Sequence, residues 1–441
     1  MSHTRPTTSR RRFLQTTTAG AASLSAGVFS SVAARPAVAA NEKLQIACIG
    51  TANRARSNIN GVQGEQIVAV CDIDDTYLDK ATEQFPDARR YNDYRELIDK
   101  EQGRVDAVVV STADHHHVPA SLWAVRNKMH VYCEKPLAHT VAEARLLTDE
   151  ARKAGVATQL GTQIHAGNNY RRVVEIVQSG AIGDVSEVHV WVGKGWGGGD
   201  RPAEGQEPPK TLHWALWLGP APVRPYAAGR YHPAQWRRWW DFGNGTMSDL
   251  GSHWNDLPFW ALNLDAPTSI EAFGPDPHPE IAPASMTAVY NYPARGDRPA
   301  CTLSWYQGTH KPAILSEIGI PAYGSGVLFV GTKGRMLMSN YSKHVLLPEA
   351  DFRDFVRPDP WIPRSVGQHQ EWLLAMRDGT STGSPFEPYA ALLTEANHLG
   401  NVAFRTGKKI DWDSASMRVT NTRDADQFLR REPREGFSLM G

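Results

Sequence analysis

The sequence lacks paired cysteines, an excess of one charge, and a long apolar run. Lysine plus arginine equals aspartate plus glutamate at 47 each, so a nucleic-acid or anionic-membrane partner is not predicted. The segment 16–34 is only weakly apolar and is rich in glycine and threonine, which argues against a membrane helix. The four cysteines are not spaced as a disulfide framework or a zinc site requires; they are Cys48, Cys71, Cys133 and Cys301.

The first 40 residues have the layout of a secretory signal. Consecutive arginines in "SRRRFLQ" precede the weakly apolar segment, and "RPAVAA" at 35–40 offers small residues to a signal peptidase. The arginines followed by Phe13 and Leu14 resemble the twin-arginine type. A disordered basic tail is the alternative. The signal predicts a bacterial periplasmic protein, exported already folded by the twin-arginine machinery.

The remainder of the 441 residues is long enough for two domains. From Leu44, short apolar runs such as "LQIACIG", "QIVAVCD" and "VDAVVVS" alternate with helical segments. Such alternation is typical of a parallel sheet covered on both faces. We therefore predict an α/β protein whose first domain, residues 41–165, is a doubly wound Rossmann sheet.

The pattern changes after residue 165. Segments such as "SEVHVWV", "MTAVYNY" and "CTLSWYQG" alternate in polarity, which favours a mainly antiparallel sheet with one solvated face. Residues 166–441 are predicted to form an α+β domain for substrate binding and oligomerisation. Residues 193–235, rich in glycine, proline and tryptophan, are expected to form long loops.

The turn after the first strand, "GTANRA", resembles a dinucleotide-binding fingerprint with one glycine of three. Gly50 is present, but Ala52 and Ala55 stand at the other two positions. An alanine at the second position adds a methyl group where the pyrophosphate approaches most closely. The helix N-terminus still favours phosphate. We take Gly50, Ala52, Asn53 and Arg54 as candidate cofactor-binding residues, with Arg54 offsetting the lost contact.

The second strand ends in Cys71-Asp72, about 20 residues beyond the turn. An acid at this place binds the ribose hydroxyls of NAD and repels the 2′-phosphate of NADP. The alternative is an aspartate that caps the next turn. After a strand–turn–helix unit, we favour Asp72 as a cofactor-binding residue and NAD over NADP.

Several motifs together carry a family resemblance. "YCEKPLAHT" follows the fifth strand, "STADHHH" follows the strand before it, and "GAIGDV" and "SDLGSHWND" lie in the second domain. From Leu44 to about Asp413 the chain resembles the glucose–fructose oxidoreductase, inositol dehydrogenase and rhizopine-catabolism family (Gfo/Idh/MocA), and within it the exported members. Ala52, Ala55 and Ala113 depart from the family pattern.

The resemblance implies roles for several residues. Lys135 would lie beside the nicotinamide and contact the reacting hydroxyl, and Lys135–Pro136 would be a cis peptide bond. Asp249 and His253, four residues apart, share one face of a helix. His253 would be the base and Asp249 an orienting group. The further cofactor-binding candidates are Thr112, His117, Glu134 and Lys135 itself.

Two residue groups complete the candidate site. The run His115–His117 reads as the entry to a helix, because adjacent histidines point in different directions; no metal is predicted. Aromatic faces suit sugar rings. The substrate-binding candidates are Gln163, His165, Asn169, Tyr170, Trp196, Arg237 and Trp240.

These observations predict an exported NAD-dependent oxidoreductase acting on a secondary hydroxyl of a sugar, cyclitol or derivative. Free NAD is not expected outside the cytoplasm, so the cofactor would stay tightly bound. One alternative is a glycoside-cleaving enzyme of the same fold that works by oxidation and elimination. Another is a non-catalytic sugar-binding protein with a vestigial cofactor site. We also expect a homo-oligomer.

Overall fold

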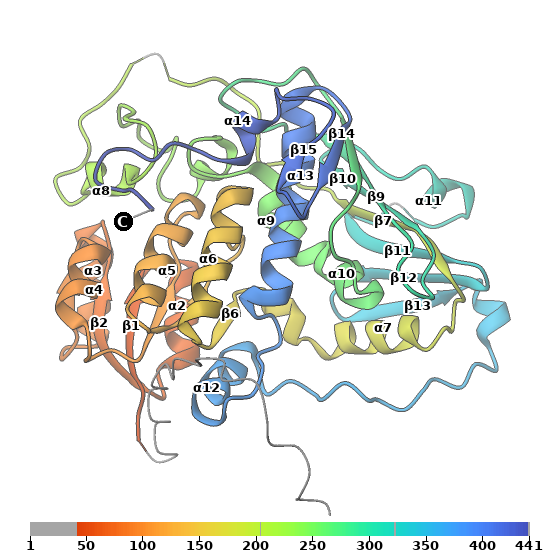
Figure 1. Ribbon diagram of the computed structural model, residues 1–441, viewed down its shortest axis with the longest axis horizontal. Helices are drawn as coiled ribbons and strands as arrows, with labels where there is room; N and C mark the ends of the chain where they lie inside the picture. The colour runs from red at the N-terminus through yellow and green to blue at the C-terminus, as the bar shows by residue number, and fades with distance from the viewer. Residues whose placement is uncertain (1–41, 203, 322, 440–441) are drawn as a thin grey trace, which may run out of the picture. The chain divides into compact units, whose positions relative to one another are not determined.

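The computed structural model of the protein describes residues 42–202, 204–321 and 323–439 (Figure 1). The predicted export signal, residues 1–40, lies outside these residues. Among the helices of the described ranges, none combines the length and the apolar character that crossing a membrane requires.

The first sheet is six-stranded and parallel throughout, in the order β3-β2-β1-β4-β5-β6. Its strand order reverses between β1 and β4, which is where doubly wound sheets bind ligands. All of β4 is buried, as expected of a strand covered on both faces. The strands are β1 (Gln45–Ile49), β2 (Gln66–Cys71), β3 (Arg89–Tyr91), β4 (Ala107–Val110), β5 (His130–Cys133) and β6 (Thr158–Leu160).

Helices cover this sheet as the sequence predicts. The N-terminus of the best-defined one, α6, carries a capping box between Thr140 and Glu143, and the helix ends at the left-handed Gly155. The helices are α2 (Arg54–Val62), α3 (Asp75–Gln84), α4 (Tyr94–Glu101), α5 (His117–Arg126) and α6 (Val141–Ala154). The predicted doubly wound fold is confirmed.

The second sheet has nine strands in the order β13-β12-β11-β7-β10-β9-β8-β14-β15. Only β10 and β7 run parallel among these pairs, so the predicted mainly antiparallel sheet is confirmed. The strands are β7 (Val185–Val192), β8 (Ser269–Phe273), β9 (Met286–Tyr292), β10 (Cys301–Gln307), β11 (Ser325–Gly331), β12 (Gly334–Asn340), β13 (Lys343–Leu347), β14 (Ile410–Asp413) and β15 (Arg418–Val419).

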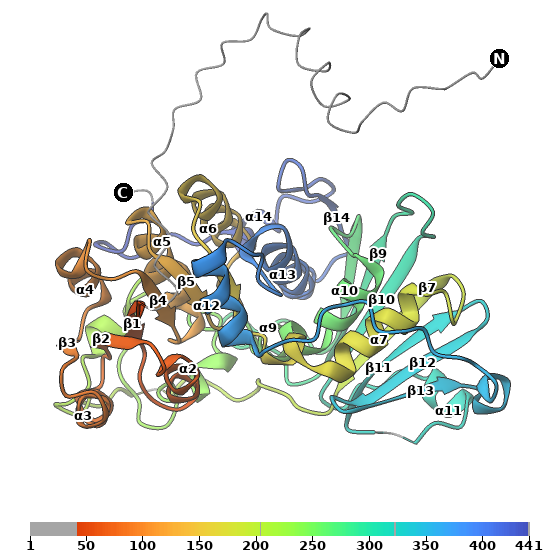
Figure 2. The ribbon, with the colours of Figure 1, turned by 90° about the horizontal axis from the view of Figure 1, so that it is seen from below.

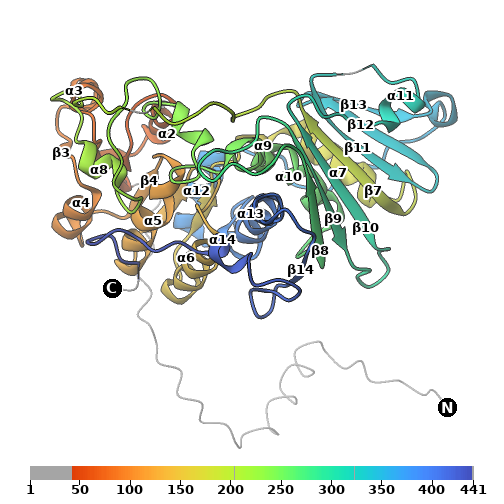
Figure 3. The same cartoon turned by 90° about the horizontal axis from the view of Figure 1, so that it is seen from above.

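One face of this sheet packs on α7 (Asn168–Gln178), α10 (Asp256–Leu262) and α13 (Ala391–Thr406), as Figure 3 shows. The short helix α11 (Ile314–Glu317) packs on the opposite face. In β9, fully buried positions alternate with partly exposed ones, which is the pattern of a strand with one core face.

Two later segments pack on the first domain. Helix α12 (Gln368–Asp378) lies beside the first sheet (Figure 2), where Trp372 joins the core cluster of Tyr132. The long segment 193–243 reaches α3, since the Asp75 amide donates to the Thr211 carbonyl at 2.9 Å. Segments after residue 165 thus contact the first domain. The domain boundary at residue 165 therefore stays a prediction.

Candidate active site

The turn after β1 requires glycine at its first position. Gly50 has φ +88°, and a Cβ placed there would lie 2.5 Å from the Ser111 carbonyl oxygen after β4. The Gly50 amide donates to the Cys71 carbonyl at 2.8 Å. The ends of β1, β2 and β4 therefore meet at this residue, and any side chain would force them apart.

In the remainder of the turn, the contact made by Arg54 differs from the one that the sequence predicts. The Ala55 amide donates to the Ala52 carbonyl at 3.0 Å, and Asn53 adopts φ 52°. The Arg54 Nε donates to Glu134 Oε1 at 2.9 Å. Arg54 thus already has a carboxylate partner at the end of β5, and its proposed contact with a pyrophosphate stays a prediction.

Asp72 occupies the end of β2, facing the same turn. Both the amide and the hydroxyl of Thr51 donate to Asp72 Oδ2 at 2.9 Å, and the Asp74 amide donates to Oδ1 at 3.1 Å. Burial raises the pKa of Asp72 to about 6, against the lowering effect of these hydrogen bonds. The carboxylate is therefore fixed beside the turn and ionised at neutral pH.

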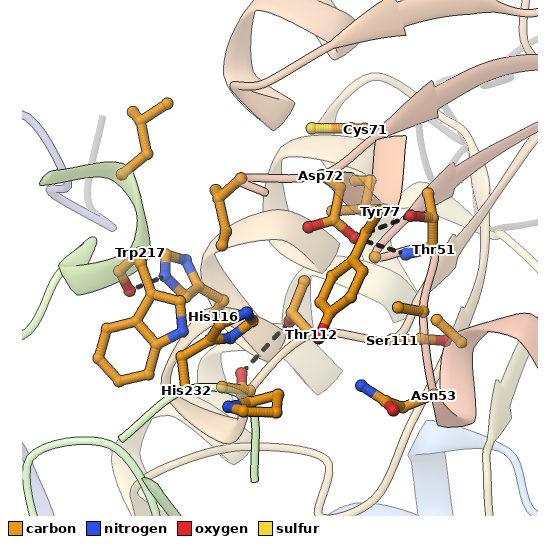
Figure 4. Close-up of a pocket in the computed structure, with 18 of the residues that line it drawn as sticks. Thr51, Asn53, Cys71, Asp72, Tyr77, Ser111, Thr112, His116, Trp217 and His232 are labelled. Carbon is orange, nitrogen blue, oxygen red and sulfur yellow. Dashed lines mark hydrogen bonds between the residues drawn. The ribbon is translucent and has the colours of Figure 1, made fainter. Parts of the chain in front are cut away.

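A pocket of about 290 Å³ opens between this turn and the 193–243 segment (Figure 4). The C-terminal Phe437 also lines it. Arg95 holds Phe437 by stacking on its ring, at 4.2 Å from the centroid. The lining includes Gly50, Thr51, Ala52, Asn53, Arg54, Asp72, Ser111 and Thr112 on the Rossmann side, and Trp217, His232, Pro233, Trp236 and Arg237 on the other.

The Glu134-Lys135-Pro136 motif meets the second domain next to this pocket. Lys135, after β5 and before a cis peptide bond to Pro136, lies 2.5 Å from Asp249 Oδ1 through its Nζ. The same ammonium donates to the Asp249 carbonyl at 2.9 Å. Their side chains are only 10% and 11% exposed. This largely buried ion pair joins the two domains.

Two further groups surround the Asp249 carboxylate. Trp196 Nε1 donates to Asp249 Oδ2 at 2.6 Å, and Arg237 Nε lies 3.5 Å from Oδ1. Burial alone raises the pKa of Asp249, but Lys135 and Arg237 outweigh it, so that the pKa lies below its usual range. Asp249 is an ionised orienting group. The structure places Trp196 and Arg237 against Asp249, and their role in substrate binding stays a prediction.

His253 lies one turn further along α9 (Gly245–Trp254), on the same face as Asp249. It is buried, and its Nδ1 has no hydrogen-bond partner among the described residues. Burial, and then the charge of Lys135, lowers the pKa of His253 to about 3. The ring is therefore neutral, and its Nδ1 is available for a hydrogen bond.

Asp114 is a buried acid that the sequence analysis did not single out. It follows β4 and is 4% exposed. Burial raises the pKa of Asp114 to about 8, against the lowering charges of Arg237 and Lys135. Its position in the motif "STADHHH" could have marked Asp114 as a site residue, but the sequence does not show that the side chain is buried. At neutral pH it is a carboxylic acid that can donate a hydrogen bond.

The three histidines after Asp114 hold loops together. His115 and His116 both bond through Nε2 to the Trp217 carbonyl, at 2.9 and 2.8 Å. His117 bonds to the carbonyls of Pro136 and Thr112, at 2.6 and 3.2 Å. His117 therefore ties the loop after β4 to the lysine motif. Thr112 lies near Gly50 and Glu134 near Arg54, and the cofactor-binding role of all three residues stays a prediction.

The structure does not bring four of the proposed substrate residues to this site. Tyr170 is fully buried and donates to the His253 carbonyl, behind α9. Asn169 bonds to His344 at 2.7 Å, and His165 lies 3.0 Å from both oxygens of the buried Asp256. Trp240 lines a separate cavity. Helix α7 is amphipathic, and Tyr170 lies on the face that packs into the protein core, which explains its burial.

Gln163 has a different status. It begins a short 3-10 turn after β6, and its Oε1 is buried without a partner among the described residues. Its substrate role stays a prediction.

The residues present fit a bound dinucleotide. Gly50 leaves a cradle at the switch point that no Cβ can share, and Asp72 offers an ionised carboxylate at the end of β2. The unpartnered Nδ1 of His253 leaves a buried polar group to be satisfied beside Lys135. These features define a dinucleotide-binding α/β protein with a lysine–aspartate–histidine site.

Comparison with known families agrees with this class. Residues 44–162 match the model described as oxidoreductase family, NAD-binding Rossmann fold, and residues 167–296 match that of its C-terminal alpha/beta domain. Together they span more than half of the 441 residues. The chain belongs to the Gfo/Idh/MocA family of oxidoreductases, with the NAD-binding Rossmann domain and the C-terminal domain of that family.

Similar proteins include dehydrogenases and a glycosidase. Inositol 2-dehydrogenase of Salmonella typhimurium is 32% identical over 146 residues, which are 33% of this chain and 43% of that protein. Glycosyl hydrolase family 109 protein 1 of Shewanella sp. strain MR-4 is 27% identical over 177 residues, 35% of this chain and 38% of that protein. The matches thus span less than half of these relatives.

Solved structures share the fold. An inositol dehydrogenase homolog from Azotobacter vinelandii, complexed with NADH and myo-inositol, aligns with a TM-score of 0.56 at 14% identity, covering 84% of this chain and 98% of that one. The WlbA dehydrogenase from Bordetella pertussis, in complex with NADH and UDP-GlcNAcA, aligns at 0.59 and 16%, covering 84% and 99%.

The raised pKa of Asp114 predicts that the free energy of unfolding depends on pH. The folded state holds this proton up to about pH 8, whereas the unfolded state loses it near pH 4. The stability of the wild type therefore falls progressively between about pH 4 and pH 8 and does not fall further above that range on account of this group. Asp114→Asn has no proton to lose at this position. Its free energy of unfolding, relative to that of the wild type, should therefore rise by up to about 6 kcal/mol between pH 4 and pH 9.

Urea unfolding across this pH range measures the difference. Asp99→Asn, at an exposed position of α4, is the matched control and should follow the wild type. A difference between Asp114→Asn and the wild type that is the same at every pH would contradict the assignment.

Proposed function

We propose that the protein is an NAD-dependent dehydrogenase that oxidises a secondary hydroxyl of a sugar, cyclitol or related polyol. The observation that carries the proposal is the buried Lys135–Asp249 pair with His253, which lies beside the nucleotide-type pocket at the sheet switch point. The inositol 2-dehydrogenases among the similar proteins support this substrate class.

NAD bound at the turn of Gly50 and Asp72 would supply the hydride acceptor for oxidation of the carbon that carries the hydroxyl. The neutral His253 takes the hydroxyl proton as that carbon becomes a carbonyl carbon. Lys135, held beside Asp249, stabilises the negative charge that develops on the substrate oxygen. Trp196 and Arg237 fix the Asp249 carboxylate, so that Lys135 stays in place. The Trp196 face is available for a sugar ring.

This assignment predicts that Lys135→Ala and His253→Ala each lose catalytic activity. Each variant should lower kcat by roughly 100-fold or more, because a positioned acid–base group is lost. Bound nucleotide should remain, since neither residue lines the pocket at the turn. Steady-state kinetics and nucleotide content measure the two effects. Lys80→Ala, on the exposed face of α3, is the control. Near-normal turnover in either variant removes that residue from the mechanism.

We further propose that NAD is preferred over NADP because the Asp72 carboxylate is fixed beside the turn and is ionised at neutral pH. A 2′-phosphate would meet this charge at close range. In equilibrium titrations of cofactor-stripped protein, Asp72→Ala should weaken NAD and strengthen NADP. Ala52→Gly should bind NAD at least as tightly as the wild type, because a methyl group is removed from the turn. Tighter binding of NADP than NAD by the wild type would contradict the role of Asp72.

The N-terminal sequence supports a proposal of twin-arginine export to the periplasm, with NAD loaded before export. The 193–243 segment and Phe437 beside the pocket support slow release of the nucleotide. Changing Arg10 and Arg11 to Lys should retain the protein in the cytoplasm, because the paired arginines are the recognised signal. Cell fractionation measures the distribution. Unchanged export of that variant refutes the signal assignment.

A second candidate is glycoside cleavage by transient oxidation and elimination. The similarity to the family 109 glycosyl hydrolases favours it. Release of aglycone from aryl glycosides without net NADH would select this reaction, whereas NADH formed in step with a ketone product would select the dehydrogenase.

A further inference from the structure

A second cavity, of about 740 Å³, lies apart from the nucleotide pocket and shares no lining residue with it. It is bounded by the start of α6, the start of α9, the end of α13 and the short helix α14 (Asp426–Leu429). Its inner residues include His139, Trp240, Asn244 and Arg405, whereas Asp426, Gln427, Arg430 and Glu432 are exposed. Trp240, a candidate from the sequence, belongs to this cavity.

Arg405 is the main charged group inside the cavity. Its guanidinium carbon lies 4.9 Å from the Trp240 ring centroid and 4.0 Å from that of Phe428. Two aromatic rings therefore contact the guanidinium. Within the described ranges, no carboxylate lies in ion-pair distance of Arg405, although most other interior arginines have one. Burial lowers the pKa of Arg405 to about 10, so the side chain still carries its charge at neutral pH.

The carboxylate next in sequence to Trp240 is already engaged. Asp241 Oδ2 accepts from Arg224 Nε at 2.8 Å and from Arg201 at 3.1 Å. Arg431, which also lines the cavity, is paired with Glu143 at 2.6 Å. The edge N–H groups of Arg405 therefore remain as donors that no described side chain accepts.

His139 forms part of the inner wall of the cavity. It is 7% exposed, and its carbonyl accepts from the Asn244 side-chain amide at 2.9 Å. Burial, followed by the charge of Arg431, lowers the pKa of His139 well below its usual value. The ring is therefore neutral, and Arg405 supplies the positive charge of the inner wall.

We propose that this cavity is a second binding site, for a small hydroxylated anion whose carboxylate or phosphate group pairs with the edge of Arg405. The planar fork of a guanidinium matches carboxylate and phosphate oxygens in a way that an ammonium does not. The exposed Asp426, Gln427 and Glu432 offer acceptors for hydroxyl groups at the mouth.

Calorimetric titration of the full-length, nucleotide-bound protein tests the proposal at constant ionic strength with chloride. The probes are inorganic phosphate, glucose 6-phosphate and gluconate, so that phosphate and carboxylate sources are compared directly. At least one should bind to the wild type, and Arg405→Met should weaken that probe at least about 10-fold, because it removes a charge-assisted pair. Arg430→Gln, which changes an exposed arginine of the same cavity, should bind as the wild type does.

Two further measurements separate this site from others. Lys135→Ala should retain the binding, since Lys135 lies in the catalytic site; loss in Lys135→Ala would show that the probe occupies the catalytic site instead and would overturn the proposal. Phenylglyoxal labelling of Arg405 in the wild type, followed by mass spectrometry, should be slowed by the same probe, and this measurement holds even where Arg405→Met does not fold.

The proposal is also overturned if no probe binds, if Arg405→Met binds as tightly as the wild type, or if that substitution changes the oligomeric state. A changed oligomeric state would assign the cavity to a contact between copies of the chain. None of these outcomes bears on the dehydrogenase activity, which has its own test.

Discussion

The ion pair between Lys135 and Asp249 is the contact on which the site depends. Lys135 follows a strand of the Rossmann sheet, and Asp249 lies on α9 of the second domain, 114 residues later. Removing one member of a buried pair typically costs about 3–5 kcal/mol, because the remaining charge is left uncompensated. The pair therefore fixes how the helix that carries His253 meets the nucleotide-type pocket.

The charges around this pair set the state of its neighbours. The ammonium of Lys135 lowers the pKa of both Asp249 and His253, whereas burial keeps Asp114 protonated. One small volume thus holds an ionised carboxylate, a neutral imidazole and a carboxylic acid. Environments that separate the pKa values of neighbouring groups are characteristic of acid–base sites.

Much of the fold follows from the sequence pattern. The continuous apolar run of β4 and the alternating β9 indicate the two kinds of sheet, and the spacing of Asp249 and His253 places both on one helical face. The short strand β3, Arg89–Tyr91, was not predicted, because none of its residues is buried. Helix α12 was also not predicted, and its partner surface on the first domain is a long-range contact that local periodicity does not encode.

The site was predicted less completely than the fold, for two physical reasons. Motifs identify residue types, but burial decides their state, which is why Asp114 was not singled out. Tyr170 shows the opposite case, because Tyr170, Val173, Val174 and Val177 recur at helical spacing and are all buried, a pattern of a core face rather than a cleft. Trp240 lay in a polar stretch of sequence, yet it lines the second cavity because the chain turns between Arg237 and Asn244.

The central claim is that a turn with one glycine of three still holds a dinucleotide in a site built around Lys135 and Asp249. The most direct measurement is the identity and amount of nucleotide released when the purified, folded protein is denatured, determined by chromatography and mass spectrometry. The account predicts NAD in stoichiometric amount, either as purified or after incubation with NAD and removal of the excess. A folded protein that retains no nucleotide under either condition would contradict it.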